Sequence, residues 1–598
     1  MMHRALLLAF LVSSQALAYD ALTRATELLY WNPAKAQNGY TFFGVGGTTY
    51  LIDMEGRVVH TWPLGNNPHL QPDGSVLDSS SNDPSGFAGF RLVDWDGRTT
   101  WQYTERRSTY HPHHDFIRIY NPKLKAYTVV YIANRDFTAA ECIAAGANPA
   151  QVPASGAQLD ALVEVDAAGT VVWEWCFFDH LVQDLDPAKA NHVGAGKTIA
   201  SHPGRLNINL AGHPLKGDWL HLNSVDYHPA LDQLVFNSVQ GECYVIDHGG
   251  TFVAGDSAAS VAKAATSAGD FLYRFGDPAR YGQGTTPAVL ADWTQSTAGT
   301  KQMGGAHGVT WIEPGLPGAG HLMIFSNAQY LSEHTPQSYV LEVDPFLDAQ
   351  GASTGRYINP PEAGYTTLTF PAVMDKTPRS ISRQVTWQYF SRSNLTLFSN
   401  IGCNGQRLPN GNTLICADTY GYVMEVTPEG ETVWDYIMPV TPKGAVLTLG
   451  DNLPMVNSIF RACRYTATHP ALVGRPLLPG KTIAGRTTVA NPYAGTTSYQ
   501  ARQRPTGLQY LDAARAQPGY TLFAAGGTTW LIDLQGRVIH TWPTGTNPRL
   551  LESGRLLDVA TNDAGATGFR EYDWNGKVTW EYFETRNGYR ARGDFTRA

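Results

Sequence analysis

The sequence predicts an all-β fold, and three observations support this prediction. First, one pattern recurs along the chain: an acidic residue or threonine, a glycine-centred turn, then a β-branched residue and an aromatic one. Second, a composition of 59 Gly, 36 Pro, 29 Tyr and 15 Trp, with only 16% charged residues, favours short strands joined by tight turns. Third, long helical periodicity is scarce, and beyond the N-terminal segment its clearest stretch lies near residues 257–268.

The recurring pattern predicts a strand, a tight turn and a second strand. Its apolar residues alternate with a period of two, and glycine supplies the positive φ that a hairpin turn requires. The segment LPNGNTLI (408–415) is another hairpin signal, and QPDGSVLD (71–78) repeats it weakly. Because the aromatic-ended hairpin recurs too often for a seven-stranded sandwich, four-stranded sheets repeated around an axis, a β-propeller, explain it better. The copies are LIDMEGRVVHTW (51–62), LVDWDGRTTWQY (92–103), EVDAAGTVVWEW (164–175), EVTPEGETVWDY (425–436), LIDLQGRVIHTW (531–542) and EYDWNGKVTWEY (571–582).

Residues 1–18 have the composition of a signal peptide. A basic start ending at Arg4 precedes a short apolar core, and Ala16-Leu17-Ala18 forms an A-x-A cleavage site. The apolar core is too short to cross a bilayer, and no later segment offers about 18 uninterrupted apolar residues. We therefore expect a secreted or periplasmic protein without a membrane span, its mature chain starting near Tyr19.

A long segment of the chain occurs twice. Residues 39–103 return as residues 519–582, but the first copy continues as HPHHDF (111–116) and the second as RARGDF (590–595). The second copy has therefore lost the histidines, and it is expected either to pack as extra strands or to replace the first copy of another subunit by strand exchange, giving a homodimer or larger oligomer. The expected organisation is a signal peptide (1–18), an N-terminal β region (19–104), a propeller body (105–473), a linker (474–504) and a partial repeat of residues 39–116 without the HPHHD histidines (505–598).

Charge and cysteine content limit the partners and the redox chemistry. A net charge of −8 without a basic run argues against a nucleic-acid partner. None of the six cysteines has C-x-x-C spacing, which weakens zinc-ribbon and thioredoxin interpretations. Cys403 and Cys416 flank the LPNGNTL turn, so a disulfide across this hairpin is expected in an exported protein. Free buried thiols are the alternative, above all for Cys142, Cys176, Cys243 and Cys463.

Three histidine clusters lie beside strand-like segments. In a propeller, each could point towards the central axis from a different sheet. Neutral imidazole can attack or accept a proton, while protonated imidazole and an asparagine amide donate hydrogen bonds to oxygens, so together they suit a tetrahedral oxyanion. Ordinary structural roles are the alternative, and HPHHD could instead be a transition-metal site. The clusters are His111-Pro112-His113-His114-Asp115, His221-Leu222-Asn223-Ser224 and Gly305-Ala306-His307-Gly308.

Several longer segments resemble the arylsulfotransferase family, in the family's order and over roughly residues 40–480. They are GDWLHLNSVDYHPALDQLVFNS (217–238), YVIDHGG (244–250), FLYRFGDPARYGQGT (271–285), GAHGVTWIEPGLPGAGHLMIFSN (305–327) and GQRLPNGNTLICADTYGYVMEVTPEGETVWDY (405–436). The resemblance implies a six-bladed propeller with a small N-terminal β-domain, working outside the cytoplasm without a nucleotide sulfate donor, a cofactor or a metal. It also implies that His307 is the nucleophile, and that His114, His221 and Asn223 bind sulfuryl oxygens or protonate the leaving phenolate.

The function predicted from this resemblance is transfer of a sulfuryl group from a phenolic sulfate ester to a phenol through a sulfohistidine. One difference from the family sequence weakens this functional prediction: Val239 or Gln240 stands where the family has an arginine after the H-x-N segment. Arg407 is the candidate to replace that arginine as a ligand of sulfate oxygens. The closely spaced cysteine pair that the better-known branch carries before the nucleophile is also missing. The alternative is a propeller that binds or supports other molecules without turnover.

Overall fold

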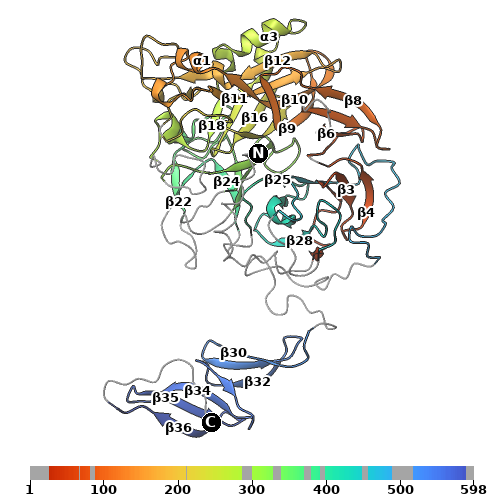
Figure 1. Ribbon diagram of the computed structural model, residues 1–598. Coiled ribbons are helices and arrows are strands. Elements are labelled where there is room, and N and C mark those ends of the chain that lie inside the picture. The colour runs from red at the N-terminus through yellow and green to blue at the C-terminus, as the bar shows by residue number, and fades with distance from the viewer. Residues whose placement is uncertain are drawn as a thin grey trace. The chain divides into compact units, whose positions relative to one another are not determined.

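The computed structural model describes residues 26–65, 67–80, 88–210, 212–285, 299–327, 338–368, 379–390, 397–447, 455–487 and 516–586 (Figure 1). The predicted signal peptide and the segment RARGDF (590–595) lie outside these residues. The chain forms two compact units, residues 1–504 and 505–598. In the described part, strands dominate and helices are few and short, as the sequence predicts. No helix in that part is both long and apolar enough to cross a membrane.

Six antiparallel sheets of four or five strands make up the described part of the first unit. In chain order their first strands are β2, β5, β9, β15, β19 and β25. The strands are β2 (Tyr40–Val45), β3 (Thr48–Ile52) and β4 (Val58–Trp62); β5 (His69–Leu70), β6 (Val76–Ser80), β7 (Gly89–Val93) and β8 (Thr99–Thr104); β9 (Tyr110–Asn121), β10 (Ala126–Phe137), β11 (Ala157–Val165) and β12 (Val171–Cys176); β15 (Leu222–His228), β16 (Gln233–Ser238), β17 (Glu242–Asp247) and β18 (Tyr273–Phe275); β19 (Ala306–Trp311), β20 (Leu322–Ser326), β21 (Tyr339–Val343) and β24 (Val385–Phe390); β25 (Asn404–Arg407), β26 (Thr413–Ala417), β27 (Tyr422–Val426) and β28 (Thr432–Ile437).

Two strands from the far ends of the unit complete these sheets. β29 (Ala462–Tyr465) pairs with β2, and β1 (Glu27–Trp31) pairs with β28. The region expected as a separate N-terminal β part (19–104) therefore shares sheets with the C-terminal end of the body and lies in the same compact unit. Smaller elements are β13 (Leu181–Val182) with β14 (Leu206–Asn207), β22 (Tyr365–Leu368) with β23 (Arg379–Ser382), and the helices α1 (Ala139–Ala144), α2 (His248–Thr251), α3 (Ser257–Ala264) and α4 (Pro360–Ala363).

The recurring sequence pattern forms the outer hairpins of the sheets, as predicted. In LIDMEGRVVHTW the backbone N–H of Gly56 donates to the carbonyl of Asp53, and Gly56 has φ +81°. The carboxylate of Asp53 accepts from the backbone N–H groups of Glu55 and Arg57, which explains why the pattern begins with an acidic residue. The aromatic residue that ends this pattern, Trp62, is buried in the core.

In five of the six sheets, the strand at one edge contacts an edge strand of a neighbouring sheet. Contacts run from β9 to β15, from β15 to β19, from β19 to β25 and from β25 to β29. These five edge strands therefore lie near other edge strands, whereas the outer hairpins lie towards the opposite edges. Side chains on these contacting strands can meet across sheets that are distant in sequence.

The second unit repeats the first two sheets of the body. β30 (Thr521–Ala525), β31 (Thr528–Ile532) and β32 (Val538–Trp542) correspond to β2–β4, and β33 (Arg549–Leu550), β34 (Leu556–Thr561), β35 (Thr567–Tyr572) and β36 (Val578–Phe583) correspond to β5–β8. The register is also the same, since Leu522 faces Leu531 as Phe42 faces Leu51. In the described residues no fourth strand pairs with β30 in the way that β29 pairs with β2.

The predicted disulfide between Cys403 and Cys416 is wrong. Asn404, not Cys403, faces Cys416 across the β25–β26 pair, so the two cysteines are one position out of register. Adjacent residues of a strand point to opposite faces. Cys403 accordingly packs beside Met323 and Phe325, whereas Cys416 packs beside Val423 and Trp434 in a different core cluster, and both are free thiols.

A buried histidine links the sheet of β11 to the sheet of β16. His248 donates from Nε2 to Glu164 (2.9 Å) and from Nδ1 to Asp232 (2.6 Å). Burial alone would lower the pKa of His248, but the hydrogen bonds and charges of both acids outweigh it and raise the pKa to about 9. The charged imidazole is therefore part of the folded structure at neutral pH.

This linkage predicts that the free energy of unfolding falls as the pH rises from about 6.5 to about 9. A group whose pKa is higher in the folded than in the unfolded protein stabilises the folded state fully at a pH below its pKa in the unfolded protein. This stabilisation is lost as the pH rises through its pKa in the folded protein. The shift corresponds to about 3 kcal/mol. Urea unfolding across this range measures it, with His248→Gln as the control expected to flatten the pH dependence. An equal slope in both proteins would contradict the assignment.

Candidate active site

The structure brings together four residues that the sequence singles out. His114 lies on β9, His221 directly precedes β15, Asn223 lies on β15, and His307 lies on β19. Nε2 of His114 is 3.1 Å from Nε2 of His221, and the ring centroids of His114 and His307 are 6.5 Å apart. Three imidazoles from three successive sheets therefore share one site.

Irregular strand pairing places these side chains. The register shifts opposite residues 113–115 of β9, at Asn223 of β15 and at Gly308 of β19. Such bulges re-aim side chains and occur often beside active sites. His114 and His221 each have φ +53°, a left-handed conformation that costs a non-glycine residue free energy and that the surrounding structure must enforce. The local backbone is thus shaped to turn these imidazoles towards one another.

His307 is buried and has one ring nitrogen fixed. Its Nδ1–H donates to Oδ1 of Asn327 (2.8 Å), and the amide nitrogen of Asn327 donates to the carbonyl of Ser399 (2.9 Å). Because this second bond sets which end of the amide faces the ring, neutral His307 carries its proton on Nδ1 and keeps a lone pair on Nε2. Burial lowers the pKa of His307 to about 4. The hydrogen bond to Asn327 raises this pKa and the charge of His221 lowers it, but burial has the largest effect. His307 is therefore a neutral imidazole at physiological pH.

His221 has the opposite electrostatic environment. Its Nδ1–H donates to a carboxylate oxygen of Asp218 at 2.5 Å. Burial disfavours the imidazolium, but the hydrogen bond and charge of Asp218 outweigh burial and raise the pKa of His221 above 6.5. The same pairing holds the pKa of Asp218 well below its usual range, in spite of burial. The site therefore contains a neutral imidazole, His307, and a proton-bearing one, His221.

His114 lies between them and is neutral. Burial lowers its pKa to about 2, and the charges of His113, His221 and His307 act in the same direction. The neighbouring His113 is 2.9 Å away between Nδ1 atoms, while Nε2 of His113 lies 3.0 Å from Asp160. His111, in contrast, is largely exposed and pairs with Asp136 (2.9 Å), so it does not join the cluster.

Asn223 acts on the backbone beside His307. Its amide nitrogen donates to the carbonyl of Ala306 (2.9 Å), which also accepts from Asn237 (2.6 Å). Asn223 is buried, and its Oδ1 has no hydrogen-bond partner in the described residues. One of its two N–H groups therefore fixes the strand that carries His307, and the second N–H remains as a donor.

A buried ion pair holds the backbone of His114 in place. The carboxylate of Asp115 accepts two hydrogen bonds from Arg461 (2.8 and 3.2 Å) and one from the backbone N–H of Val225 (3.0 Å). Asn67 donates both to Asp115 (3.0 Å) and to the carbonyl of His114 (3.1 Å). These contacts join residues from four sheets next to the histidines.

Arg407, expected to clamp sulfate oxygens, lies elsewhere. Its guanidinium pairs with Glu342, donates to the carbonyl of Gly411 (2.9 Å) and lies over the ring of Trp387. It therefore stabilises the β25–β26 hairpin and contacts none of the histidines. Where the family has its arginine, Gln240 is buried, and its Oε1 lies 3.4 Å from Nη2 of Arg280.

Sequence reasoning missed five residues of the site. The sequence gave a weak indication of Asp218, which stands in a turn three residues before His221. It also gave a weak indication of Asn327, the last residue of the family-like segment 305–327. His113 belonged to a named cluster without a role of its own. Asp160 and Arg461 gave no signal, since Asp160 contacts Leu222 at a separation of 62 residues and Arg461 contacts Asp115 at a separation of 346 residues.

One group has ligand types suited to a metal ion. Ligand atoms of His113, Asp160 and Asp218 all lie within 4.8 Å of one another. Each carboxylate already contacts an imidazole, Asp160 that of His113 and Asp218 that of His221. The expected HPHHD metal set does not assemble, because His111 points away to Asp136.

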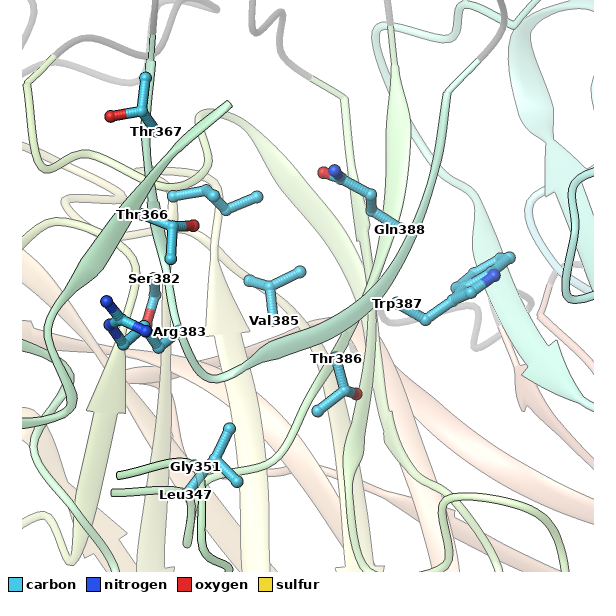
Figure 2. A pocket seen from close by; sticks show the side chains of 11 residues that line it. Leu347, Gly351, Thr366, Thr367, Ser382, Arg383, Val385, Thr386, Trp387 and Gln388 are labelled. Carbon is cyan, nitrogen blue, oxygen red and sulfur yellow. The ribbon is translucent and has the colours of Figure 1, made fainter. Parts of the chain in front are cut away.

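A pocket of about 450 Å³ lies at β24 and the β22–β23 hairpin (Figure 2). Threonines and a serine line it, together with Arg383, Trp387 and Gln388. None of the predicted site residues is among its lining residues, and the lining offers no histidine, cysteine or carboxylate for catalysis. The histidine cluster therefore remains the candidate site.

Comparison with known proteins gives one family match. The family model described as arylsulfotransferase matches residues 48–344, a range that contains His114, His221, Asn223 and His307. No curated protein matches the chain. Among solved structures, a protein of unknown function from Bacteroides caccae is 10% identical with a TM-score of 0.31, covering 72% of this chain and 99% of its own. The WD40 domain of coronin from Toxoplasma gondii is 8% identical with a TM-score of 0.28, covering 68% and 71%.

These two structural likenesses are too distant to carry an argument. The family match rests on the sequence itself and spans four of the five quoted segments, those between residues 217 and 327, but not the segment 405–436. The chain therefore matches the arylsulfotransferase family over residues 48–344.

Proposed function

We propose that the protein transfers a sulfuryl group from a phenolic sulfate ester to a phenolic acceptor, through a covalent sulfohistidine at His307. The family match supports aryl-sulfate sulfotransferase activity in general. The observation that carries the finer proposal is a buried neutral His307, with a lone pair on Nε2, beside a proton-bearing His221 and a neutral His114.

Each half-reaction is a displacement at sulfur. Nε2 of His307 attacks the sulfur, an N–S bond forms, and the bond between sulfur and the phenolic oxygen breaks with its electron pair on that oxygen. A phenolate has a pKa of about 10, so it leaves more readily when an imidazolium supplies a proton. In the second half, the acceptor phenol returns the proton and its oxygen attacks the sulfohistidine. The bond to Asn327 holds His307 in the same orientation throughout.

We further propose that the six sheets are blades of a six-bladed propeller, with the contacting edge strands around its axis. The pairing of β29 with β2 supports this arrangement, because it closes the first sheet with a strand from the other end of the body. The order of contacts from β9 to β29 supports it as well. The site would then lie in the central channel, and the export expected from the sequence would place it outside the cytoplasm.

A non-catalytic binding propeller is the second candidate, favoured by the missing family arginine and by Arg407 being paired with Glu342. A coloured aryl-sulfate assay with a phenol acceptor discriminates between them. Turnover supports the enzyme, whereas binding of phenolic sulfates without turnover supports the alternative.

The activity should follow a bell-shaped pH profile with a wide top. His307 must be neutral and the proton of His221 must be available, so activity rises through about pH 4. It falls on the alkaline side when His221 loses its proton, and Asp218 moves that limb upward because it raises the pKa of His221. An exposed imidazole would instead give a rising limb near 6.5, the ordinary pKa of histidine. Initial rates from pH 3.5 to 10 test this, and a rising limb near 6.5 would contradict the role of burial at His307.

A further inference from the structure

Three imidazoles and two carboxylates form one continuous chain of contacts. From one end to the other, the distances are 2.5 Å from Asp218 to Nδ1 of His221, 3.1 Å between the Nε2 atoms of His221 and His114, 2.9 Å between the Nδ1 atoms of His114 and His113, and 3.0 Å from Nε2 of His113 to Asp160. The chain begins beside the reacting groups and ends at a carboxylate that is fully buried.

The carboxylates at the two ends of this chain, Asp218 and Asp160, favour particular positions for its protons. Asp218 accepts from His221, which therefore carries a proton on Nδ1. Nε2 of His113 lies 3.0 Å from Asp160 without hydrogen-bond geometry, and the negative charge of Asp160 favours a proton on that nitrogen. Each contact between two imidazoles needs one proton. If His113 is neutral, its Nδ1 accepts from Nδ1–H of His114, and Nε2 of His114 then accepts from Nε2–H of His221. The chain holds one proton more than three neutral imidazoles do, and His221 bears the charge.

The same contacts allow a second arrangement without any ring turning over. If each shared proton moves across its own hydrogen bond, His221 becomes neutral, His114 carries its proton on Nε2, and His113 bears the charge beside Asp160. The two arrangements differ only by two proton shifts of less than an ångström or so along existing contacts. The positive charge moves from the Asp218 end to the Asp160 end.

We propose that His113 and Asp160 form the far end of a proton relay that serves the leaving and entering phenolic oxygens through His114, an inference that rests on the proposed sulfuryl transfer. In the first half-reaction, the phenolate oxygen takes the place of His221 as acceptor and receives the proton from Nε2 of His114. Nδ1 of His114 then takes the proton from Nδ1 of His113, which is left neutral with its proton on Nε2, near Asp160. The acceptor phenol reverses these steps, so no proton is gained or lost over a full cycle.

Burial and connectivity distinguish this pair from an ordinary ion pair. Asp160 is fully buried, and its second oxygen has no hydrogen-bond partner in the described residues. Its first oxygen also accepts from the backbone N–H of Leu222 (3.1 Å), so it fixes the start of β15 as well. The neighbouring pair of His111 and Asp136 has the same chemistry but is exposed and ends there without reaching His114. That pair supplies a matched control.

The test compares two donors in the full-length protein. Phenyl sulfate has a leaving group with a pKa of about 10 and needs a proton, whereas a nitrophenyl sulfate leaves as a stabilised phenolate that needs little help. We expect Asp160→Asn, which keeps an oxygen for Leu222, to lower kcat/KM for phenyl sulfate by roughly 10²-fold and for the nitrophenyl ester by less than about threefold. His113→Gln should do the same, and Asp136→Asn should change neither.

The outcomes separate the relay from the reaction itself. Equal losses with both donors in Asp160→Asn and His113→Gln would mean a structural role and would overturn the relay while leaving the sulfuryl transfer standing. Unchanged rates with both donors would overturn it too. A wild-type protein inactive with either donor would overturn the proposed function and the relay with it. One bound metal ion per chain, with loss of both activities on chelation, would assign His113, Asp160 and Asp218 to coordination and overturn the relay.

Discussion

His307→Ala is expected to abolish turnover of aryl sulfates, by a factor on the order of 10⁴ or more. Removal of the nucleophile from a covalent mechanism removes the whole route, and comparable losses follow when a catalytic nucleophile is removed from other enzymes. His307 is the buried neutral imidazole of the cluster, and its bond to Asn327 directs the lone pair of Nε2 away from that amide. Steady-state rates with a coloured aryl sulfate and a phenol acceptor measure the effect.

The matched control for this prediction is His111→Ala. His111 lies on β9 with His114 but is exposed and pairs with Asp136, so its loss should leave the rate within about twofold of wild type. Circular dichroism and thermal unfolding check that both variants fold. If His307→Ala turns over aryl sulfates at the wild-type rate, the nucleophile is another imidazole, and His114 or His221 becomes the candidate.

Arg461→Ala should lower the free energy of unfolding by about 3–5 kcal/mol. Removing one partner of a buried ion pair leaves the other charge uncompensated. Here the charge left behind is that of Asp115, which is fully buried and accepts two hydrogen bonds from Arg461. Burial would raise the pKa of Asp115, but the charge of Arg461 and the neighbouring hydrogen bonds hold it well below its usual range, so the carboxylate is ionised at neutral pH.

Two further variants calibrate this effect. Arg57→Ala breaks a partly exposed pair with Asp53 and should cost less than about 1 kcal/mol. Asp115→Asn combined with Arg461→Ala should regain part of the loss, because it removes the uncompensated charge. Urea unfolding at neutral pH measures all three. A loss below about 1 kcal/mol for Arg461→Ala would mean that Asp115 is compensated by other groups, such as His69 and Asn67.

Local sequence patterns predict the hairpins well because each hairpin is fixed by its own residues. In LIDMEGRVVHTW the acidic residue, the glycine and the terminal aromatic each have a visible local role in the structure. The pairing of β2 with β29 could not be predicted in this way. It joins Phe42 to Cys463 across most of the chain, and the short segment ACRY has no alternating pattern of its own.

The disulfide prediction failed for a related reason. Two cysteines that flank a turn appear to face each other in the sequence, but the pairing of Asn404 with Cys416 sets the register one residue away. A shift of one residue moves a side chain to the opposite face of the sheet. Spacing alone does not determine this register.

The residues of the candidate site also differ in whether the sequence alone could reveal them. His221, Asn223 and His307 could be found because they stand in segments that resemble a family, and His114 because it stands in a histidine cluster. The structure brings the four together. Arg407 was chosen only as a nearby guanidinium in sequence, and Glu342 holds it elsewhere. The partners that set protonation, above all Asp218 and Asn327, become visible only when the strands are placed side by side.

Trapping the covalent intermediate tests the central claim most directly. The full-length protein is mixed with a phenolic sulfate in the absence of an acceptor, quenched under non-acidic conditions, digested and analysed by mass spectrometry. The account predicts one added sulfuryl group, located on His307, which disappears when a phenol is added before the quench and is absent from His307→Ala. A wild-type protein that turns over aryl sulfates while the added group is found on another residue, or on none, would contradict it.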